Sequence, residues 1–353
     1  MPLQPYLKRI IEDREILSRV DAAELLRSIL RGESTDLEIA ALLGSLATRG
    51  AASTEIAGFV DTMREAATPV PLTQAERTLL VDTCGTGADL SGTFNISTAA
   101  ALVSAAAGAG LMVAKHGNRA VTSQCGSADV LEALGIPVGL SPAEGAASLR
   151  KHRFAFFHAP TLHPAMKKVM PVRRALGIRT IFHLVGPLSN PAGASAQVMG
   201  VYAPHFVPLA AEAMVILNTR HAFVVHGETD NSGMDEFSIS GPSHFAEVHN
   251  GIVTLGTLTP EDVGLTRAPI ESLRGGDAGT NAQILTAIFS GEKGPRRDIV
   301  LLNAAAVLVT ADLAPDLPTG IALAAKAIDT ESVTALVSAL RAEPRSPPSR
   351  TIF

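Results

Sequence analysis

The segment Asp82–Gly108 reads DTCGTGADLSGTFNISTAAALVSAAAG, and the segment Lys115–Gly135 reads KHGNRAVTSQCGSADVLEALG. The first segment follows a short apolar run, and the second begins where another such run ends. Each segment contains a loop of glycines and hydroxyl residues that leads into a helix-like run. This pattern is typical of strand–loop–helix units, which assemble into parallel sheets and bind ligands at the carboxyl ends of their strands. Two such loops in tandem predict an α/β domain and a ligand with more than one phosphate group.

The chain before these loops is helical in pattern. Apolar residues recur at helical spacing, Thr35 precedes one helix-like run as a capping residue, and another run starts at Ser53. No strand pattern occurs before Thr78. We therefore predict a small helical domain over residues 1–70, which ends in a linker that contains prolines.

Strand patterns return downstream, at Phe154–Phe157 and Ala222–Val225. A basic, helix-like run lies between them, and we expect it to return to the helical domain. The predicted fold is a small helical domain plus a larger α/β domain with a mostly parallel central sheet flanked by helices. The predicted division is a helical part (1–70 with about 163–185), an α/β part (71–162 and 186–345) and a flexible tail (346–353).

Composition narrows the functional class. The 353 residues are 46% hydrophobic, enough for a large core, and the formal charge of -5 argues against a general nucleic-acid binder. Cys84 and Cys125 are too few for a disulfide framework and suit a reducing cytosol. The N-terminal residues carry charges where a signal peptide needs an apolar core, and the longest apolar run is too short to span a membrane. We expect a cytoplasmic protein with neither membrane nor nucleic-acid partners.

The first loop has the features of an anion site. Gly85 and Gly87 allow the backbone to direct several N–H groups at an anion, and Asn95–Thr98 begins a helix whose free N–H groups favour an oxyanion. Neither the nucleotide motif G-x-x-x-x-G-K-[ST] nor G-x-G-x-x-G is present. Taken alone, such a loop is as often a plain turn.

The second loop adds polar groups. Lys115 ends a buried strand, where a charge needs an anion or a carboxylate. Asn118 and Arg119 follow on a tight turn, and Ser127 stands at the next helix start as its cap. Hydroxyls, an amide and a cation together match a diphosphate with a sugar.

Further charged residues lie outside the loops. Asp235 and Glu236 are adjacent acids that could be solvated or, near a diphosphate, could hold Mg²⁺, with Ser97 as a further oxygen ligand. Arg173 and Arg174 could clamp a carboxylate through paired hydrogen bonds or lie on a helix surface. No cluster typical of zinc sites or serine hydrolases occurs in the sequence.

These segments together resemble the anthranilate phosphoribosyltransferase family over nearly the whole chain. The motifs that carry the resemblance are GTGAD (85–89), TFNISTAAA (93–101), KHGNRAVTSQCGSADVLEALG (115–135), HPAMKKVMPVRRALGIRTIF (163–182), GPLSNPA (186–192), MDE (234–236), GGDAGTNAQ (275–283) and RRDIVLLNAAAVL (296–308). The resemblance implies transfer of 5-phosphoribose from phosphoribosyl diphosphate to the amine of anthranilate, in tryptophan biosynthesis. It also implies a homodimer formed through the helical domain.

The resemblance implies site residues as well. Phosphoribosyl diphosphate is expected at Gly85, Ala88, Asp89, Thr93, Asn95, Ile96, Ser97, Thr98, Lys115, His116, Gly117, Asn118, Arg119, Ala120, Val121, Thr122, Ser123 and Ser127. Anthranilate is expected at Gly85, Asn118 and Arg173, with His116 and His163 nearby. Mg²⁺ is expected at Ser97, Asp235 and Glu236. Lys115, Asn118 and Arg173 would position the reactants, and no residue is expected as acid or base.

The sequence departs from the family at two places. Ala88 replaces the second adjacent glycine of the usual GTGGD, and its Cβ is expected to exclude positive φ or to crowd the diphosphate. The loop from His226 to the acids Asp235 and Glu236 is longer than usual. We expect activity to survive both changes with altered donor affinity.

Two other functions compete with this interpretation. A pyrimidine nucleoside phosphorylase shares the architecture, and release of free base from thymidine or uridine by phosphate would identify it. Against it, the chain is short and lacks that family's lysine–histidine–serine signature. A catalytically silent relative that binds nucleic acid would show salt-dependent DNA binding without turnover.

Overall fold

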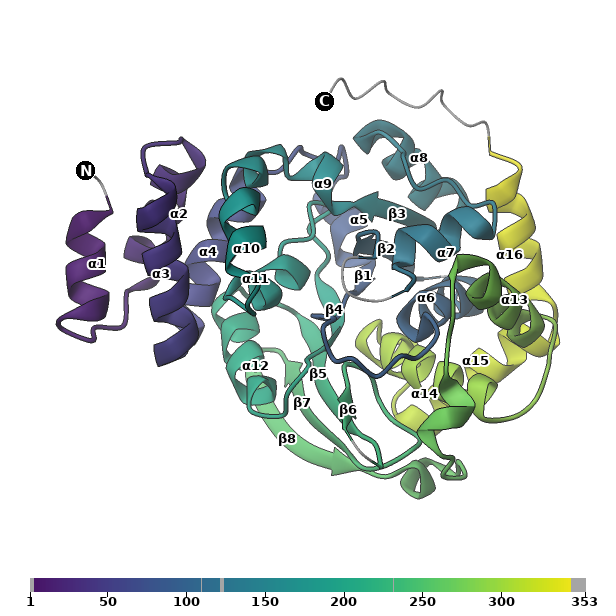
Figure 1. Cartoon of the computed structure of the whole chain (residues 1–353). Helices are drawn as coiled ribbons and strands as arrows, with labels where there is room; N and C mark the ends of the chain where they lie inside the picture. Colours follow the sequence, from purple (N-terminus) through teal and green to yellow (C-terminus); the bar gives the residue numbers. More distant parts are fainter. Residues whose placement is uncertain (1–2, 109, 121–123, 231, 344–353) are drawn as a thin grey trace.

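The computed structural model of this chain describes residues 3–108, 110–120, 124–230 and 232–343. An N-terminal group of helices stands beside a larger body built around a sheet (Figure 1). The helices of this group are α1 (Gln4–Ile11), α2 (Arg19–Leu30), α3 (Asp36–Arg49) and α4 (Ser53–Glu65). As predicted, Thr35 caps α3, and its hydroxyl accepts a hydrogen bond from the Glu38 N–H.

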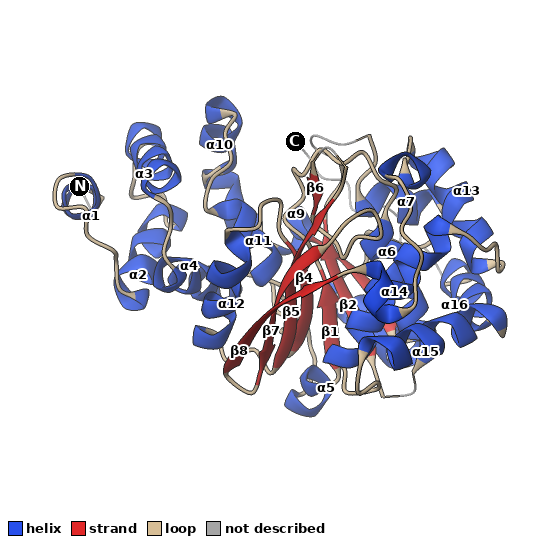
Figure 2. Cartoon of the chain, turned by 90° about the horizontal axis from the view of Figure 1, so that it is seen from below, coloured by secondary structure: helices blue, strands red, loops and turns tan. Residues whose placement is uncertain are grey.

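The central sheet is mostly parallel, as the sequence predicts. Its strand order is β3-β2-β1-β4-β5-β7-β8, with β6 paired to β5. Figure 2 shows the sheet between layers of helices. The strands are β1 (Leu80–Thr83), β2 (Met112–Gly117), β3 (Phe154–His158), β4 (Ala196–Gly200), β5 (His221–Glu228), β6 (Gly233–Met234), β7 (Ser243–His249) and β8 (Ile252–Leu258). The strands β3, β2, β1, β4 and β5 run parallel to one another. The strands β6 and β7 pair antiparallel with β5, and β8 pairs antiparallel with β7.

Helices cover both faces of the sheet. The α/β helices are α5 (Gln74–Thr78), α6 (Ile96–Ala107), α7 (Ser127–Ala133), α8 (Pro142–His152), α9 (Ala159–Leu162), α11 (Phe182–Leu188), α12 (Phe206–Ile216), α13 (Ala278–Phe289), α14 (Pro295–Thr310), α15 (Leu317–Asp329) and α16 (Ser332–Arg341), with 3-10 turns at Pro260–Val263 and Ile270–Leu273. Successive residues of a strand point to opposite faces, and β5 shows this clearly. Phe223 packs into the core shared with α6 and α14, whereas Ala222 and Val224 pack into the core shared with α12.

The basic segment before α11 packs against the N-terminal helices. It forms a 3-10 turn, η1 (Pro164–Lys168), and the helix α10 (Met170–Leu176). Val169 and Val172 share one core with residues of α2, α3 and α4, and that core continues over α12 onto the sheet. This packing supports the division that we propose, in which about 163–185 returns to the helical part.

The β7–β8 hairpin was not foreseen. Its turn is Asn250–Gly251, and both residues have positive φ, at 50° and 81°. Two residues with positive φ suit the type I′ turns that join twisted antiparallel strands, and Asn-Gly is their commonest sequence. The predicted flexible tail lies outside the described residues, and no helix within them is long and apolar enough to cross a membrane.

Candidate active site

One asparagine side chain joins the two glycine loops. Asn95 precedes α6, and its Nδ2 donates to the Cys125 carbonyl at 3.2 Å. Its Oδ1 accepts a hydrogen bond of 2.9 Å from the Asn281 Nδ2 on α13. The loops that follow β1 and β2 therefore lie together at the carboxyl ends of these strands, as the tandem pattern suggested.

A carboxylate that the sequence interpretation overlooked fastens the second loop. The Asp129 Oδ2 accepts hydrogen bonds from the Ala120 N–H at 2.8 Å and the Gly126 N–H at 2.9 Å. The Arg119 guanidinium pairs with Asp129 and with Glu132 on α7, at 3.0 and 2.8 Å. Arg119 is thus directed at helix carboxylates in this structure. The only sequence signal for Asp129 was its place as an acid in the first turn of α7.

The other predicted residues of this loop lie close together. Ser127 is the first residue of α7 and not its cap, and Gly126 takes the cap position. The Ser127 hydroxyl donates instead to the Asn118 carbonyl at 3.2 Å. A Cβ on Gly117 would lie 2.3 Å from the same hydroxyl, so this approach requires glycine. The predicted contacts Val121, Thr122 and Ser123 lie outside the described residues.

The start of α6 and the end of β2 meet at a buried lysine. The Lys115 ammonium donates to the Thr83 carbonyl at 2.6 Å, to the Thr83 hydroxyl at 3.1 Å and to the Ser97 hydroxyl at 3.4 Å. No carboxylate contacts the ammonium within the described part of the chain. Burial lowers the pKa of Lys115. The side chains of Ile96 and Thr98 are buried in α6, so Thr98 offers a ligand only its backbone N–H, and the Ile96 N–H already donates to the Phe94 carbonyl at 2.7 Å.

Three carboxylates converge beside this lysine. Ligand oxygens of Asp89, Asp235 and Glu236 lie within 4.8 Å of one another. Burial, together with the Asp89 charge, raises the pKa of Asp235 to about 7, and burial with the Asp235 charge raises that of Glu236. The Glu236 Oε2 has no hydrogen-bond partner among the described residues. The sequence predicted that Asp89 contacts phosphoribosyl diphosphate, but not that it belongs to an acid cluster.

A small cavity adjoins these acids. Its volume is about 20 Å³, and Gly85 and Ser97 line it together with Asp235 and Glu236. This volume suits roughly one water molecule or one small ion. Crowded oxygen ligands with an unpartnered buried carboxylate oxygen fit Mg²⁺, which prefers carboxylates and keeps some of its waters.

Backbone contacts fix the position of the acid pair. The Gly87 N–H donates to the Asp235 Oδ2 at 2.7 Å. A Cβ on Gly200 would lie 1.4 Å from the Asp235 carbonyl oxygen, so only glycine fits at the end of β4. Asn303 on α14 accepts from the Phe237 N–H at 3.0 Å and donates to the Phe237 carbonyl at 2.9 Å.

The sequence interpretation did not identify the last two of these contacts. Asn303 had a readable signal, because a polar amide inside the apolar run LLNAAAVL needs buried hydrogen-bond partners. Gly200 had none, since the segment that it contacts lies far along the chain.

Ala88 corrects an expectation. Its φ is 61°, so its Cβ does not exclude the positive φ that the family's glycine permits. This conformation costs a residue with a Cβ about 1–2 kcal/mol. The Ala88 carbonyl accepts a hydrogen bond from the Arg179 guanidinium, which lies 4.3 Å above the Tyr202 ring. Arg179 was not predicted, and crowding of the diphosphate by Ala88 stays a prediction.

Arg173, on α10, is a cation without an acid. Its guanidinium contacts the Met170 sulfur and lies 5.2 Å from the centre of the Phe182 ring. No carboxylate pairs with it in the described ranges, and burial lowers its pKa. Arg174, its neighbour, is exposed. Of the two predicted clamps, Arg173 is therefore the better placed for an anionic ligand.

Two predicted histidines pack together. The rings of His116 and His163 meet edge to face, with 5.3 Å between their centres. Burial lowers the pKa of His116 to about 3 and that of His163 to about 4, so both are neutral near pH 7. They offer an aromatic surface rather than charge.

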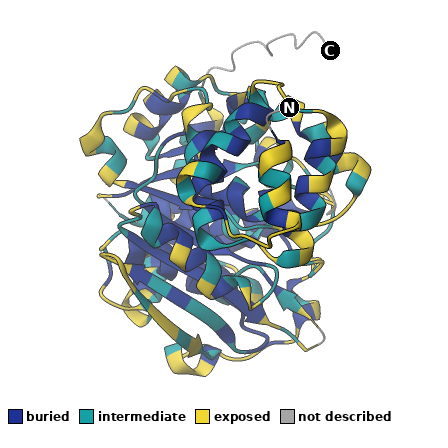
Figure 3. Cartoon of the chain, turned by 90° about the vertical axis from the view of Figure 1, so that its left-hand side faces the viewer, coloured by how far each residue is buried: buried dark blue, intermediate teal, exposed yellow. Residues whose placement is uncertain are grey.

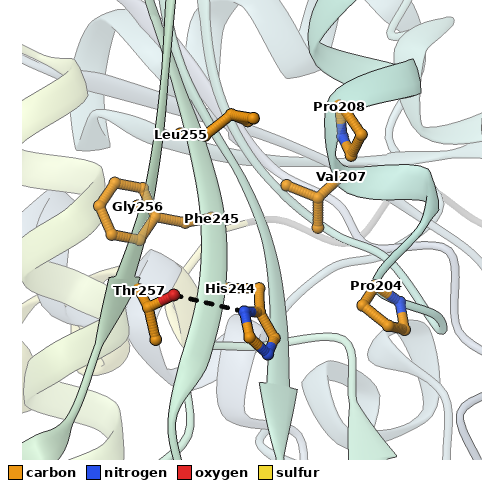
Figure 4. Close-up of a pocket in the computed structure, with 8 residues that line it drawn as sticks. All are labelled: Pro204, Val207, Pro208, His244, Phe245, Leu255, Gly256 and Thr257. Carbon is orange, nitrogen blue, oxygen red and sulfur yellow. Dashed lines mark hydrogen bonds between the residues drawn. The ribbon is translucent and has the colours of Figure 1, made fainter.

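A larger hollow of about 390 Å³ lies elsewhere (Figure 4). Its lining comes from α12, from the segment just before α12 and from the β7–β8 hairpin, and includes Pro204, Val207 and Leu255. None of the predicted site residues lines it. We therefore place the candidate site at the two loops and the acid cluster.

Family models match both parts of the chain. Residues 4–67 match the helical bundle domain of a glycosyl transferase family, and residues 77–333 match its a/b domain. The anthranilate phosphoribosyltransferase of Symbiobacterium thermophilum is 47% identical over 96% of this chain and 97% of its own length. That of Chloroflexus aggregans is 48% identical over 94% of this chain and 95% of its own.

Solved structures give the same result. The anthranilate phosphoribosyltransferase of Thermus thermophilus superposes with a TM-score of 0.88 at 42% identity, over 95% of this chain and 98% of that one. The Saccharomyces cerevisiae enzyme, solved in complex with PRPP and Mg, has a TM-score of 0.84 at 26% identity, over 96% of each chain.

The contact at Gly200 generates a prediction. Gly200→Ala should displace the backbone of Asp235 and weaken divalent-ion binding at the acid cluster by about 10–100-fold, because residues that orient metal ligands have effects of this size. Titration with Mn²⁺, a stand-in for Mg²⁺ followed by electron paramagnetic resonance, measures this.

Gly139→Ala is the control, since nothing lies within 4 Å of its Cβ position. Equal Mn²⁺ affinities in the two variants would contradict the proposed positioning.

Proposed function

The chain belongs to the anthranilate phosphoribosyltransferase family, and we propose that it transfers the 5-phosphoribosyl group of phosphoribosyl diphosphate to the amine of anthranilate. The products are N-(5-phosphoribosyl)anthranilate and diphosphate, in tryptophan biosynthesis. The observation that carries this proposal is the cluster of Asp89, Asp235 and Glu236 beside two joined glycine loops. Relatives of the same name match nearly the full chain, and they lend no support to a nucleoside phosphorylase or to a nucleic-acid-binding relative.

The donor's phosphates fit the two loops. Free N–H groups at the start of α6 and the backbone around Gly85 favour an oxyanion, whereas the Gly87 N–H already donates to Asp235. Lys115 adds a positive charge at the same edge of the sheet. Asp89, Asp235 and Glu236, with Ser97, would hold Mg²⁺, which when bound neutralises the charge of the departing diphosphate. The other donor contacts named from the sequence remain part of this proposal.

The transfer itself needs alignment more than proton transfer. The amine nitrogen forms a bond to the anomeric carbon of the ribose while the bond from that carbon to diphosphate breaks, through an oxocarbenium-like state. The nitrogen then loses a proton, which the basic oxygens of the released diphosphate can accept. Neutral His116 and His163 are weak bases, since burial keeps their pKa at about 3 and about 4. We therefore assign them to contact with the aromatic ring, and we assign no residue as a general base.

Arg173 suits the anthranilate carboxylate. A guanidinium that has lost part of its hydration, and that pairs with no acid among the described residues, gains most from a carboxylate that accepts two parallel hydrogen bonds. Its place on α10, which packs with the N-terminal helices, would set the acceptor opposite the donor loops. Asn118 and Gly85 complete the proposed acceptor contacts.

We further propose a homodimer formed through the N-terminal helices, in the cytoplasm and without nucleic acid. Exposed residues occur on these helices (Figure 3). The apolar Val20 and Leu37 are among them, at 77% and 83% exposed. Apolar side chains that protrude at helix ends gain free energy when a partner covers them.

The first test follows anthranilate fluorescence after addition of phosphoribosyl diphosphate and Mg²⁺. The fluorescence should fall with time as product forms. The fall should stop when Asp235 and Glu236 are both replaced by Ala, because the diphosphate then loses its metal. No fall with freshly purified protein, or an equal fall in the double variant, would refute the proposed reaction.

The second test separates the two substrates. Arg173→Ala should raise the KM for anthranilate more than that for the donor, by a binding loss of about 1.5–3 kcal/mol from the missing charged hydrogen bonds. Steady-state kinetics with each substrate varied in turn measures both constants.

Arg174→Ala is the matched control, being an exposed arginine on the same helix. An equal rise of the anthranilate KM in both variants would point to a general charge effect and not to a carboxylate clamp.

The third test concerns the dimer. Val20→Glu combined with Leu37→Glu should shift the protein from dimer to monomer in analytical ultracentrifugation, because charges would enter the apolar contact. Leu255→Glu, at an exposed apolar position on β8, should leave the dimer intact. A monomeric parent protein would remove the proposal, as would an intact dimer in the double variant.

A further inference from the structure

Three potential metal ligands meet at the end of the sheet opposite the candidate active site. His221 is the first residue of β5 and pairs in register with His249 of β7. Glu247 lies two residues before His249 on the same strand, so both side chains point to the same face as His221. One ligand atom from each residue lies within 4.8 Å of those of the other two.

The contacts around His221 are those of an oriented ligand. Its side chain is buried, its Nε2 lies 2.8 Å from the Glu247 Oε1, and its Nδ1 lies 3.2 Å from the Asp312 Oδ1. The His249 ring stacks on the His221 ring, with 4.2 Å between the ring centres, and His249 is exposed. Asp312, which follows α14, also forms an ion pair with Arg220.

We propose that His221, Glu247 and His249 bind a divalent transition metal, with Zn²⁺ the first candidate. Two imidazoles and one carboxylate are an established zinc ligand set, with a further position left for water. Imidazole ligands favour zinc and its neighbours over Mg²⁺, which prefers oxygen. Asp312 would act behind His221, because a carboxylate on the far ring nitrogen fixes the tautomer and orientation of a metal-bound histidine.

The arrangement needs little adjustment. A metal about 2.0–2.2 Å from both the His221 nitrogen and the Glu247 oxygen would hold these atoms about 3.3 Å apart, only slightly wider than their present contact. His249 must turn out of its stacked position to direct a nitrogen at the metal, and its exposure leaves room for this.

This site would be separate from the acid cluster. The strand β5 runs from His221 to Glu228, which puts the two ends of the sheet roughly 20 Å apart at about 3.3 Å per residue. A bound metal would join β5 and β7 and, through Asp312, the end of α14. The metal would therefore crosslink these elements and stabilise this end of the sheet, and it would take no part in phosphoribosyl transfer.

Zinc binding to the full chain tests the proposal. The protein, free of any histidine tag, is stripped with a chelator and then competes with a chromophoric chelator for Zn²⁺. His249→Ala and Glu247→Gln should each weaken this site at least about 10-fold, and Asp312→Asn about 10–100-fold, as for partners that orient a ligand. Co²⁺ in place of Zn²⁺ should give visible absorption that His249→Ala loses.

Two controls isolate the site. His244→Ala should bind Zn²⁺ like the parent, because His244, also on β7, meets one carboxylate of the described residues, Glu228, at 2.7 Å. Its other side-chain hydrogen bond, with Thr257, is shown in Figure 4. Asp235→Asn should remove any zinc held by the acid cluster and leave the histidine site unchanged.

Each possible outcome bears on the proposal. No zinc bound by the Asp235→Asn protein, or equal binding in His249→Ala and the parent, would show an ion-pair network without a metal site. His249 is exposed, so its variant should fold, which circular dichroism verifies. Loss of the phosphoribosyl transfer reaction would leave this result unaffected, because the zinc readout needs no turnover.

Discussion

Three carboxylates held close together are the constraint on which the site depends. Asp89, Asp235 and Glu236 repel one another, and burial disfavours the charged forms of Asp235 and Glu236, so the cluster is costly until a cation joins it. Surrounding features offset part of this cost. The Gly87 N–H donates to one acid, the Lys115 charge lies near, and Asn303 fixes the backbone that follows the pair. The site is therefore organised for a metal-bound, highly charged ligand.

Much of this site could be predicted because local sequence decides it. Glycines and hydroxyl residues after a short strand predict an anion loop, and parallel strands bring successive loops to one edge. The contacts of Gly200 and Asn303 could not be predicted in the same way, because each depends on which distant segment the fold places beside it. The β7–β8 hairpin belongs to neither group: Asn250–Gly251 is a strong turn signal that the sequence interpretation passed over.

Ala88 shows where residue preference misleads. A Cβ disfavours positive φ without forbidding it, and a cost of about 1–2 kcal/mol is small beside the contacts that hold a loop. Here the neighbouring backbone binds Asp235 on one side and Arg179 on the other. The surrounding structure thus imposes a conformation that the isolated residue would rarely adopt.

The core beneath the N-terminal helices has a mechanical consequence. It continues from α2, α3 and α4 through α12 to one face of the sheet. Packed apolar layers resist being pulled apart but allow small sliding steps. Movement that admits anthranilate and then shuts out water would accordingly be a shear of α10 and its neighbours along this core. A free hinge would expose the core to solvent at every turnover.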